Sequence, residues 1–579
     1  MVNYGVLGRY KTFFSGVGTL TILIKLLKQC YSQFHSHYRV QRLLRHIRPF
    51  MPARPRWEKL LAEQPFLHFN STSPKILFAT GTGSHWSMSG FESVLAAALK
   101  IRGAEIKVLL CDGILPACQE CDLRLFPKAR LLKEGAQPLC GTCFKPAKKM
   151  FAELDVSVIS YSEWLIKEDE IEIEEVLKKV HDNDLSKIIW RGIAVGEHAV
   201  AGTLRFFGRG DIVGEVHGKS ILRQYLRASL ITTAILQRLL TTHHFDRVVF
   251  HHGIYVPQGI VGDVCRQFGV AVVNWHPAYR DRSYIFSHDD TYHKTMIDEP
   301  CQIWENIDLD ANKEQQVMTY LESRREGGND WITFQRHNNF LFTQIQELNL
   351  DFSRPIIGLL TNVMWDAQLH FRHNAFNSIL EWLLFTVEYF IQRRDLQLLI
   401  RIHPAEILGS VPSRQRAVDE IHARFPKLPA NICIVNADTP INTYALMQHC
   451  DTVLVYGTKM AIELPCWGIP VIVAGEAWAR GKGFTIDATS PNEFRQMLDA
   501  LPHGVLLDEK RVKRARQYAY HLFHRRMIPV DFARRFKHFV PFAYDFSSMN
   551  ALLPTVDKGL DVICNGILYG KPFIYDENG

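Results

Sequence analysis

LLIRIHPAEI (398–407), ICIV (432–435) and TVLVYGTKMAIELPCWGIPVIVAGEAWARGKGFTID (452–487) are the stretches that decide the fold. Their short β-branched runs alternate with helical segments, which is the pattern of βαβ units in a parallel sheet. Basic residues, hydroxyl-bearing residues and glycines come directly after the end of each β-branched run. Ligands of open parallel sheets bind outside the carboxyl ends of the strands, so we expect a binding site there. These residue types suit a phosphorylated, hydroxyl-rich ligand such as a nucleotide or a nucleotide-sugar.

The same strand, polar turn and helix pattern opens two parts of the chain. PIIGLLTNVMWD (355–366) echoes KILFATGTGSHW (75–86), and RVVFHHGIYVPQG (247–259) adds a further strand that ends in polar residues. The sequence therefore predicts an α/β protein with two Rossmann-like, doubly wound domains. The glycine loop GTGSHW lacks the full dinucleotide fingerprint, so NAD binding is not predicted. It is either a ligand-binding loop or a tight turn with a helix cap.

The chain is too long for a single core, at 579 residues, and its composition of 47% apolar and 22% charged residues is that of a folded globular protein. We expect four regions. They are a basic extension at 1–70, a first domain at 71–345 with a cysteine insertion at 111–145, a second domain at 346–500, and a C-terminal helical region at 501–579 that packs across both domains.

The net charge of +7 comes from the basic extension, because residues 1–50 hold eight Lys and Arg and no Asp or Glu. No apolar run reaches the roughly 18–20 residues that span a bilayer. Three interpretations stay open: a solvated, partly helical basic extension, a peripheral contact with an anionic inner-membrane surface, or a true signal or anchor segment. Nucleic-acid binding is not predicted, because the tract carries no recognition module.

The insertion contains two CxxC pairs separated by eighteen residues, Cys118 with Cys121 and Cys140 with Cys143. This spacing is typical of a four-thiolate structural zinc site and predicts a zinc-ribbon-like module. An iron–sulfur cluster and four unrelated thiols are the alternatives. The other cysteines are scattered through apolar runs, which favours a reducing, cytoplasmic setting.

The strand ends of the second domain supply the candidate binding residues. Pro404 can begin a helix whose N-terminus faces an anion, while Arg401 and His403 can donate hydrogen bonds to a phosphate. A carboxylate at Glu463 could accept hydrogen bonds from ribose hydroxyls. The predicted donor-binding set is Arg401, His403, Pro404, Thr443, Thr458, Lys459 and Glu463.

The motifs RIHPAE, VYGTKMAIELPCWGIPVIVAG and GKGFT resemble those of bacterial capsule and surface polysaccharide biosynthesis proteins. These include glycosyltransferases of the two-Rossmann GT-B type, among them the Kdo transferases. The resemblance is good over 355–490, looser over 75–300, and does not cover the basic extension or the cysteine insertion. It implies that the second domain holds a nucleotide-sugar donor and that the first holds a glycan or glycolipid acceptor.

Transfer requires a general base and a positive environment for the leaving phosphate. The candidates for the base are His85, Glu92 and His252. No convincing DxD motif is present, since HDND (181–184) and HDD (288–290) are weak matches, and catalysis without a metal is therefore favoured. Two alternatives to a transferase stay open, a non-catalytic nucleotide- or glycan-binding component of an assembly complex and a nucleotide-sugar epimerase.

Overall fold

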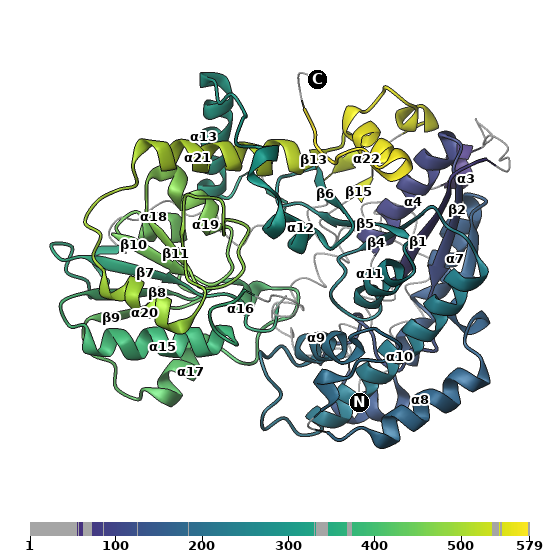
Figure 1. Cartoon of the computed structure of the whole chain (residues 1–579), viewed down its shortest axis with the longest axis horizontal. Helices are drawn as coiled ribbons and strands as arrows, with labels where there is room; N and C mark the ends of the chain where they lie inside the picture. The colour runs from purple at the N-terminus through teal and green to yellow at the C-terminus, as the bar shows by residue number, and fades with distance from the viewer. Residues whose placement is uncertain are drawn as a thin grey trace, which may run out of the picture.

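The computed structural model describes residues 55, 57–61, 72–84, 86–123, 126–182, 184–328, 330–331, 345–366, 373–534, 543–544 and 547–576. Within them, two lobes lie side by side, and each is built on a large sheet flanked by helices (Figure 1).

The first lobe contains a seven-stranded sheet in the order β13-β6-β5-β4-β1-β2-β3. The strands from β5 to β3 are parallel, and β6 and β13 close one edge in antiparallel pairing. The strands are β1 Lys75–Gly81, β2 Glu105–Leu110, β3 Ser157–Ser160, β4 Arg247–His251, β5 Ala271–Pro277, β6 Ser283–His288 and β13 Ile528–Pro529. The parallel part has the doubly wound order 3-2-1-4-5.

Helices bury both faces of this sheet, which explains why β1 and β4 are apolar without alternation. The main helices are α4 Trp86–Ile101, α7 Phe144–Glu153, α8 Lys167–Lys179, α9 Val195–Phe207, α10 Gly218–Thr242, α11 Gln258–Gln267 and α12 Tyr292–Asp298.

The second lobe contains a six-stranded parallel sheet in the order β12-β11-β10-β7-β8-β9. The strands are β7 Ile356–Leu360, β8 Gln397–Arg401, β9 Ile432–Val435, β10 Thr452–Val455, β11 Val471–Val473 and β12 Ile486–Asp487. Its helices are α15 Ile379–Gln392, α16 Ala405–Leu408, α17 Ala417–Arg424, α18 Thr443–Met447, α19 Met460–Glu463, α20 Pro491–Asp499 and α21 Glu509–Tyr520. Two doubly wound parallel sheets are thus present, as the strand pattern predicts.

Two segments connect the lobes. Helix α13, Ala311–Glu326, packs in the core of the second lobe although it precedes that lobe's first strand. After α21 the chain makes a π-helical turn, His521–Arg526, adds β13 to the first sheet, and ends in α22, Lys558–Tyr569, which packs against α4. Figure 1 shows α21 running along the top of the second lobe toward the first. The second lobe therefore includes a helix that precedes its first strand, and the first lobe includes a strand and a helix that follow the second lobe in the chain.

The zinc-ribbon prediction is not confirmed. The described part of the insertion forms short helices and no strand, α5 Lys128–Glu134 and α6 Gln137–Cys140. Cys118 lies against Cys121, whereas Cys140 donates to the Ala136 carbonyl and Cys143 accepts from the Gly83 amide. Among the described residues, no three His, Cys, Asp or Glu side chains are placed to hold a metal ion.

The basic extension lies outside the described residues, apart from Pro55 and the segment 57–61, where α3 spans Trp57–Leu60. None of the helices in the described parts of the chain is both long enough and apolar enough to cross a bilayer.

Candidate functional site

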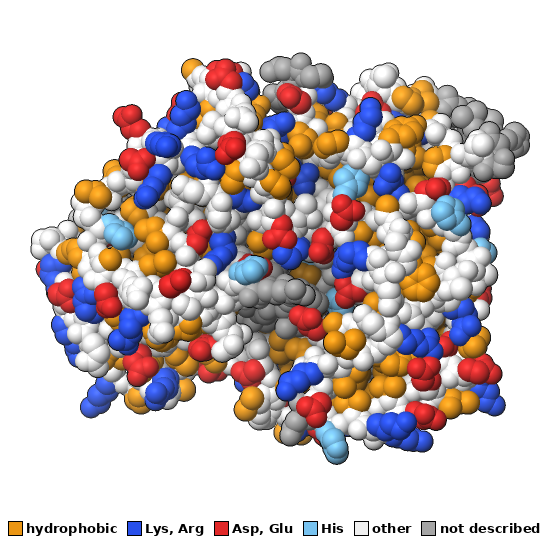
Figure 2. Space-filling model, in the orientation of Figure 1, with side chains coloured by type: hydrophobic (Ala, Val, Ile, Leu, Met, Phe, Trp, Pro, Cys, Tyr) orange, Lys and Arg blue, Asp and Glu red, His pale blue; other side chains and the backbone are white. Residues whose placement is uncertain are grey.

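A cavity of about 330 Å³ lies where the carboxyl ends of the second sheet face the first lobe. Figure 2 shows that this side of the molecule is hollowed between the lobes, with charged side chains of both signs around the hollow. Every predicted donor-binding residue lines the cavity: Arg401, His403, Pro404, Thr443, Thr458, Lys459 and Glu463. The hairpin after β5 and helices α12 and α13 supply other lining residues, among them Tyr279, His293 and Arg324.

His403 follows β8 and is held by its neighbours. Its backbone amide donates to Thr361 Oγ1 at 2.9 Å, and its Nδ1 accepts from the Ala405 amide at 3.0 Å. The proton of the neutral ring is therefore on Nε2. Burial, together with Lys459 and Arg401, lowers the pKa of His403 to about 4, so the ring is neutral at pH 7. Helix α16 has only four residues, which leaves little of the helix dipole that the sequence suggested.

Arg401 lines the cavity but is occupied by the protein itself. Its guanidinium donates to Thr443 Oγ1 and to the carbonyls of Thr439 and Ile441, each at 3.3 Å, and also to the Asn436 carbonyl. The side chain thus holds the loop that precedes α18, rather than offering its whole fork to a ligand. Strand alternation predicts where Arg401 lies but not the loop carbonyls that come to meet it.

Lys459 lies in the loop between β10 and α19. Its Nζ is 3.0 Å from the centroid of the Tyr279 ring, which reaches over from the hairpin of the first sheet. Burial and, to a lesser extent, Arg324 lower the pKa of Lys459, Glu463 and Asp330 oppose them, and the net pKa is about 7. The beginning of α19 is ordered by Thr458, whose Oγ1 accepts from the Met460 amide at 3.4 Å.

Glu463 is fully buried, and both of its carboxylate oxygens have protein partners. Oε2 accepts from the Tyr444 hydroxyl at 2.5 Å, and Oε1 lies 3.2 Å from Arg324 Nη2. Arg324 also pairs with Asp330, which accepts a hydrogen bond from Tyr320 at 2.7 Å. A ribose-binding role for Glu463 therefore competes with a buried ion pair. Sequence reasoning missed Arg324 and Asp330, because they come from a stretch that reads as a polar linker.

The three candidates for the general base are in different situations. His85 lies outside the described residues. Glu92 is sealed in the first core, where it accepts from Thr80 at 2.5 Å and from Trp275 Nε1 at 3.1 Å, and burial raises its pKa to about 7. It is not among the described residues that line the cavity.

His252 lies just after β4 in a left-handed conformation, with φ of 63°. Its ring centroid is 5.3 Å from that of His276 and 6.3 Å from that of His293. His293 lines the cavity, and burial, assisted by His276, lowers its pKa to about 3. This histidine group at the carboxyl edge of the first sheet is placed next to the cleft, as the strand ends suggest.

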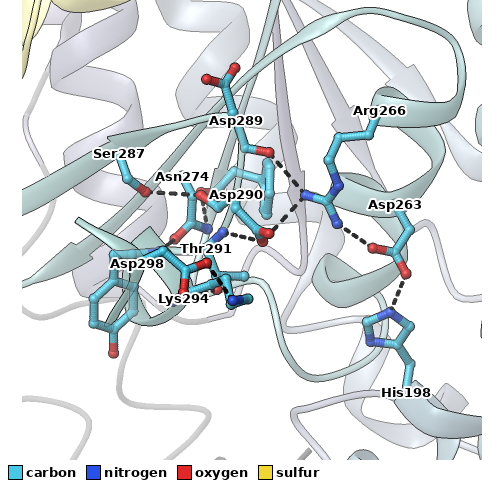
Figure 3. Close-up of polar contacts among 12 residues, drawn as sticks. His198, Asp263, Arg266, Asn274, Ser287, Asp289, Asp290, Thr291, Lys294 and Asp298 are labelled. Carbon is cyan, nitrogen blue, oxygen red and sulfur yellow. Dashed lines mark hydrogen bonds and ion pairs between the residues drawn. The ribbon is translucent and has the colours of Figure 1, made fainter. Parts of the chain in front are cut away.

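A polar chain behind this group fixes its geometry (Figure 3). His198 Nδ1 is 3.0 Å from the Ile254 carbonyl, and its Nε2 is 2.9 Å from the Asp263 carboxylate. Both partners are acceptors, so both ring nitrogens must carry protons and His198 is an imidazolium. Burial lowers its pKa, but Asp263 and the Ile254 carbonyl more than offset this, and the net pKa is raised.

Arg266 extends the chain from Asp263 to the turn before α12. It donates to the Asp289 carbonyl at 3.2 Å and lies 3.5 Å from the Asp290 carboxylate, which also accepts from the Thr291 amide at 2.7 Å. In the HDD sequence, His288 ends β6, and Asp289 and Asp290 form the turn before α12. The chain connects the His252 loop to the helix that carries His293.

The two doubly wound lobes and the polar cavity between them define a two-lobed α/β protein. Residues 333–515 match the profile of the family described as capsule polysaccharide biosynthesis protein. This match falls on the second lobe, the part of the chain whose motifs resemble that family. No curated protein matches the chain.

The solved structures that the chain matches have low identity to it. The β-Kdo 2,4-transferase KpsC of Thermosulfurimonas dismutans is 13% identical, with a TM-score of 0.33, over 53% of this chain and 87% of its own. The β-Kdo 2,7-transferase of KpsC from the same organism is 14% identical, with a TM-score of 0.30, over 49% and 79%. The UDP-GlcNAc 2-epimerase of Neisseria meningitidis is 10% identical, with a TM-score of 0.23, over 77% and 95%. At TM-scores this low, none of these likenesses bears on function.

Replacement of Arg324 by Met should lower the free energy of unfolding by about 3–5 kcal/mol, because it leaves Asp330 and Glu463 buried without their cation. Arg511→Met is the matched control. Its exposed pair with Asp508 should contribute about 1 kcal/mol or less. Urea denaturation of both variants measures the difference, and equal losses would contradict a structural role for the buried pair.

Replacement of His198 by Gln should destabilise the fold in a pH-dependent way. The raised pKa means that the imidazolium contributes its full stability below the unfolded pKa of about 6.5, and loses it as the pH rises through the folded pKa. We expect a loss of about 1–3 kcal/mol at pH 6 that shrinks in alkaline buffer. Denaturation of wild type, His198→Gln and the exposed His181→Gln across this range measures it. A loss independent of pH would argue against an imidazolium.

Proposed function

We propose that this protein is a metal-independent glycosyltransferase of the GT-B type that takes its sugar from a nucleotide-sugar held in the cleft. The observation that carries the proposal is the convergence of His403, Thr458 and Lys459 on one cavity between two doubly wound lobes. The family match over 333–515 supports a role in capsule or surface polysaccharide biosynthesis.

The chemistry of the cavity favours a phosphorylated ligand. Lys459 is half-buried with a pKa of about 7, and the neutral His403 carries its proton on Nε2, so a phosphate placed between them would gain charge-assisted hydrogen bonds. In a transfer reaction, the same two groups would stabilise the charge that develops on the departing phosphate. Their partial burial strengthens this effect, because water screens the interaction less.

The acceptor hydroxyl must lose a proton as the sugar is transferred. We propose His252 as the general base, since Glu92 is sealed in the first core and His252 lies at the carboxyl edge of the first sheet, beside His293. The acceptor would be a glycan or glycolipid that approaches from this side of the cleft.

We also propose that the protein works in the cytoplasm at the inner membrane surface. The support is in the sequence, because residues 1–50 contain eight Lys and Arg and no Asp or Glu. Each basic residue near an anionic surface contributes about 1 kcal/mol.

Two other functions would use the same cleft. A non-catalytic component would bind the nucleotide-sugar without releasing nucleotide, and an epimerase would invert the sugar without transferring it. The half-buried amine of Lys459 favours a reaction that develops negative charge, and hence a transferase or an epimerase over a passive component.

Incubation with a panel of nucleotide-sugars should release free nucleotide for at least one of them when a glycan acceptor is present. Lys459→Met should weaken binding of that donor by about 10- to 100-fold, because a charged hydrogen bond is lost, while the exposed Lys510→Met should bind as wild type. Affinity should also fall as the pH rises above about 7, where Lys459 loses its proton, and Lys459→Met should flatten this dependence. Binding without release would contradict a transferase.

The zinc site stays a prediction that rests on the spacing of Cys118, Cys121, Cys140 and Cys143. Metal analysis of the purified protein should find about one zinc per chain, and Cys140→Ser should lower this content. Cys301→Ser, far from the pairs in sequence, is the control and should not. Purified wild-type protein that contains no zinc would contradict the prediction.

A further inference from the structure

Glu476 is a buried carboxylate at the cavity with one oxygen that no described residue satisfies. The side chain is 7% exposed and lines the cavity. Oε1 accepts a hydrogen bond from the His373 amide, whereas Oε2 is buried and has no hydrogen-bond partner among the described residues. A buried carboxylate oxygen without a donor is costly, which points to a partner supplied from outside the chain.

The backbone around Glu476 is held in place by close packing. Its amide donates to Asn374 Oδ1 at 2.8 Å, and the preceding Gly475 donates to the Tyr456 carbonyl at 3.0 Å. A Cβ at position 475 would lie 2.7 Å from atoms of Tyr456, so only glycine allows this approach. The carboxylate is therefore presented by a fixed loop.

The location of this loop relates Glu476 to the proposed phosphate site. Strands β10 and β11 are hydrogen-bonded neighbours, with Val455 opposite Val473. Lys459 follows β10 and Glu476 follows β11, so the two loops leave the same edge of the sheet from neighbouring strands, and both residues line the same cavity. A nucleotide whose phosphate lies at the first loop could therefore bring its ribose to the second.

The adjoining wall is aromatic. Trp478 and His293 both line the cavity, with ring centroids 5.8 Å apart, and Tyr279 lies 6.4 Å from Trp478. Flat rings beside a hydrogen-bonding carboxylate suit a ligand that has both an apolar face and hydroxyl groups.

We propose that Glu476 is the carboxylate that binds the ribose hydroxyls of the nucleotide, in place of Glu463. This inference rests on the proposed function, because it takes the cavity's ligand to be a nucleotide. An ionised carboxylate only accepts hydrogen bonds, so its partner must be a donor, and a ribose offers two adjacent hydroxyls. Glu463 differs from Glu476, because its Oε2 accepts from Tyr444 and its Oε1, although without a hydrogen bond among the described residues, is compensated by the Arg324 guanidinium at 3.2 Å. No described cation pairs with Glu476 in this way.

The test compares each of the four ribonucleoside 5′-monophosphates with its 2′,3′-dideoxy counterpart by calorimetric titration. Wild-type protein should bind at least one ribonucleotide about 10- to 100-fold more tightly than the dideoxy form, since the hydroxyls bond to a charged acceptor. In Glu476→Gln the amide oxygen stays with the His373 amide, and the NH₂ group meets the hydroxyls. The ratio should then fall to about 1, with the affinity for the dideoxy form unchanged.

Glu381→Gln is the control. Glu381 lies on α15, does not line the described cavity, and accepts a hydrogen bond from the Asn377 amide just before that helix. It should keep the wild-type ratio. If Glu476→Gln keeps that ratio, or weakens both ligands equally, the assignment of Glu476 is overturned while nucleotide binding stands. If wild-type protein binds none of the nucleotides, the proposed function fails and this inference fails with it.

Discussion

The buried ion pairs of Arg324 with Asp330 and Glu463 are the interaction on which the cleft depends. Arg324 is on α13, which precedes the second lobe, and Glu463 is on α19 within it. A charge buried this deeply is tolerated only with close partners, so the two segments must stay together. Because α19 begins directly after Lys459, the same contact also sets where the lysine lies. The position of the proposed phosphate site therefore follows from a salt bridge that need not touch the ligand.

This arrangement also explains why the cavity contains both carboxylates and basic side chains whose pKa is lowered. Each charge is stabilised by an opposite charge and destabilised by burial, and the pKa of Lys459 is about 7 because burial and Arg324 outweigh Glu463 and Asp330. An incoming phosphate adds negative charge and shifts that balance toward the protonated lysine. The protein thus fixes the position of Lys459 before the ligand binds, and a bound phosphate then favours the protonated lysine. This is a form of electrostatic preorganisation.

Sequence reasoning could predict the fold well, because parallel strands that are buried on both faces give continuous β-branched runs. It placed Arg401, His403 and Lys459 at strand ends for the same reason, and all three line the cavity. It could not predict which of them are occupied by the protein, since the carbonyls that meet Arg401 belong to a loop about 35 residues further along the chain. Arg324 and Asp330 were missed because a helix that packs on a lobe beginning later in the chain gives no local signal.

Whether a polar group has a partner within the protein is a better guide to the site than its residue type. Glu463 and Arg401 have the residue types that a sequence reader would select, yet Arg401 donates to the protein's own loop carbonyls and Glu463 is held by Tyr444 and by its ion pair with Arg324. Glu476 has no motif to mark it, but one of its oxygens is buried and without a donor in the described structure. A folded chain rarely leaves such a group without a purpose, because the loss of hydration is not compensated. The ligand should therefore be sought where the protein's own hydrogen bonds are incomplete, between the aromatic wall and the loop that follows β11.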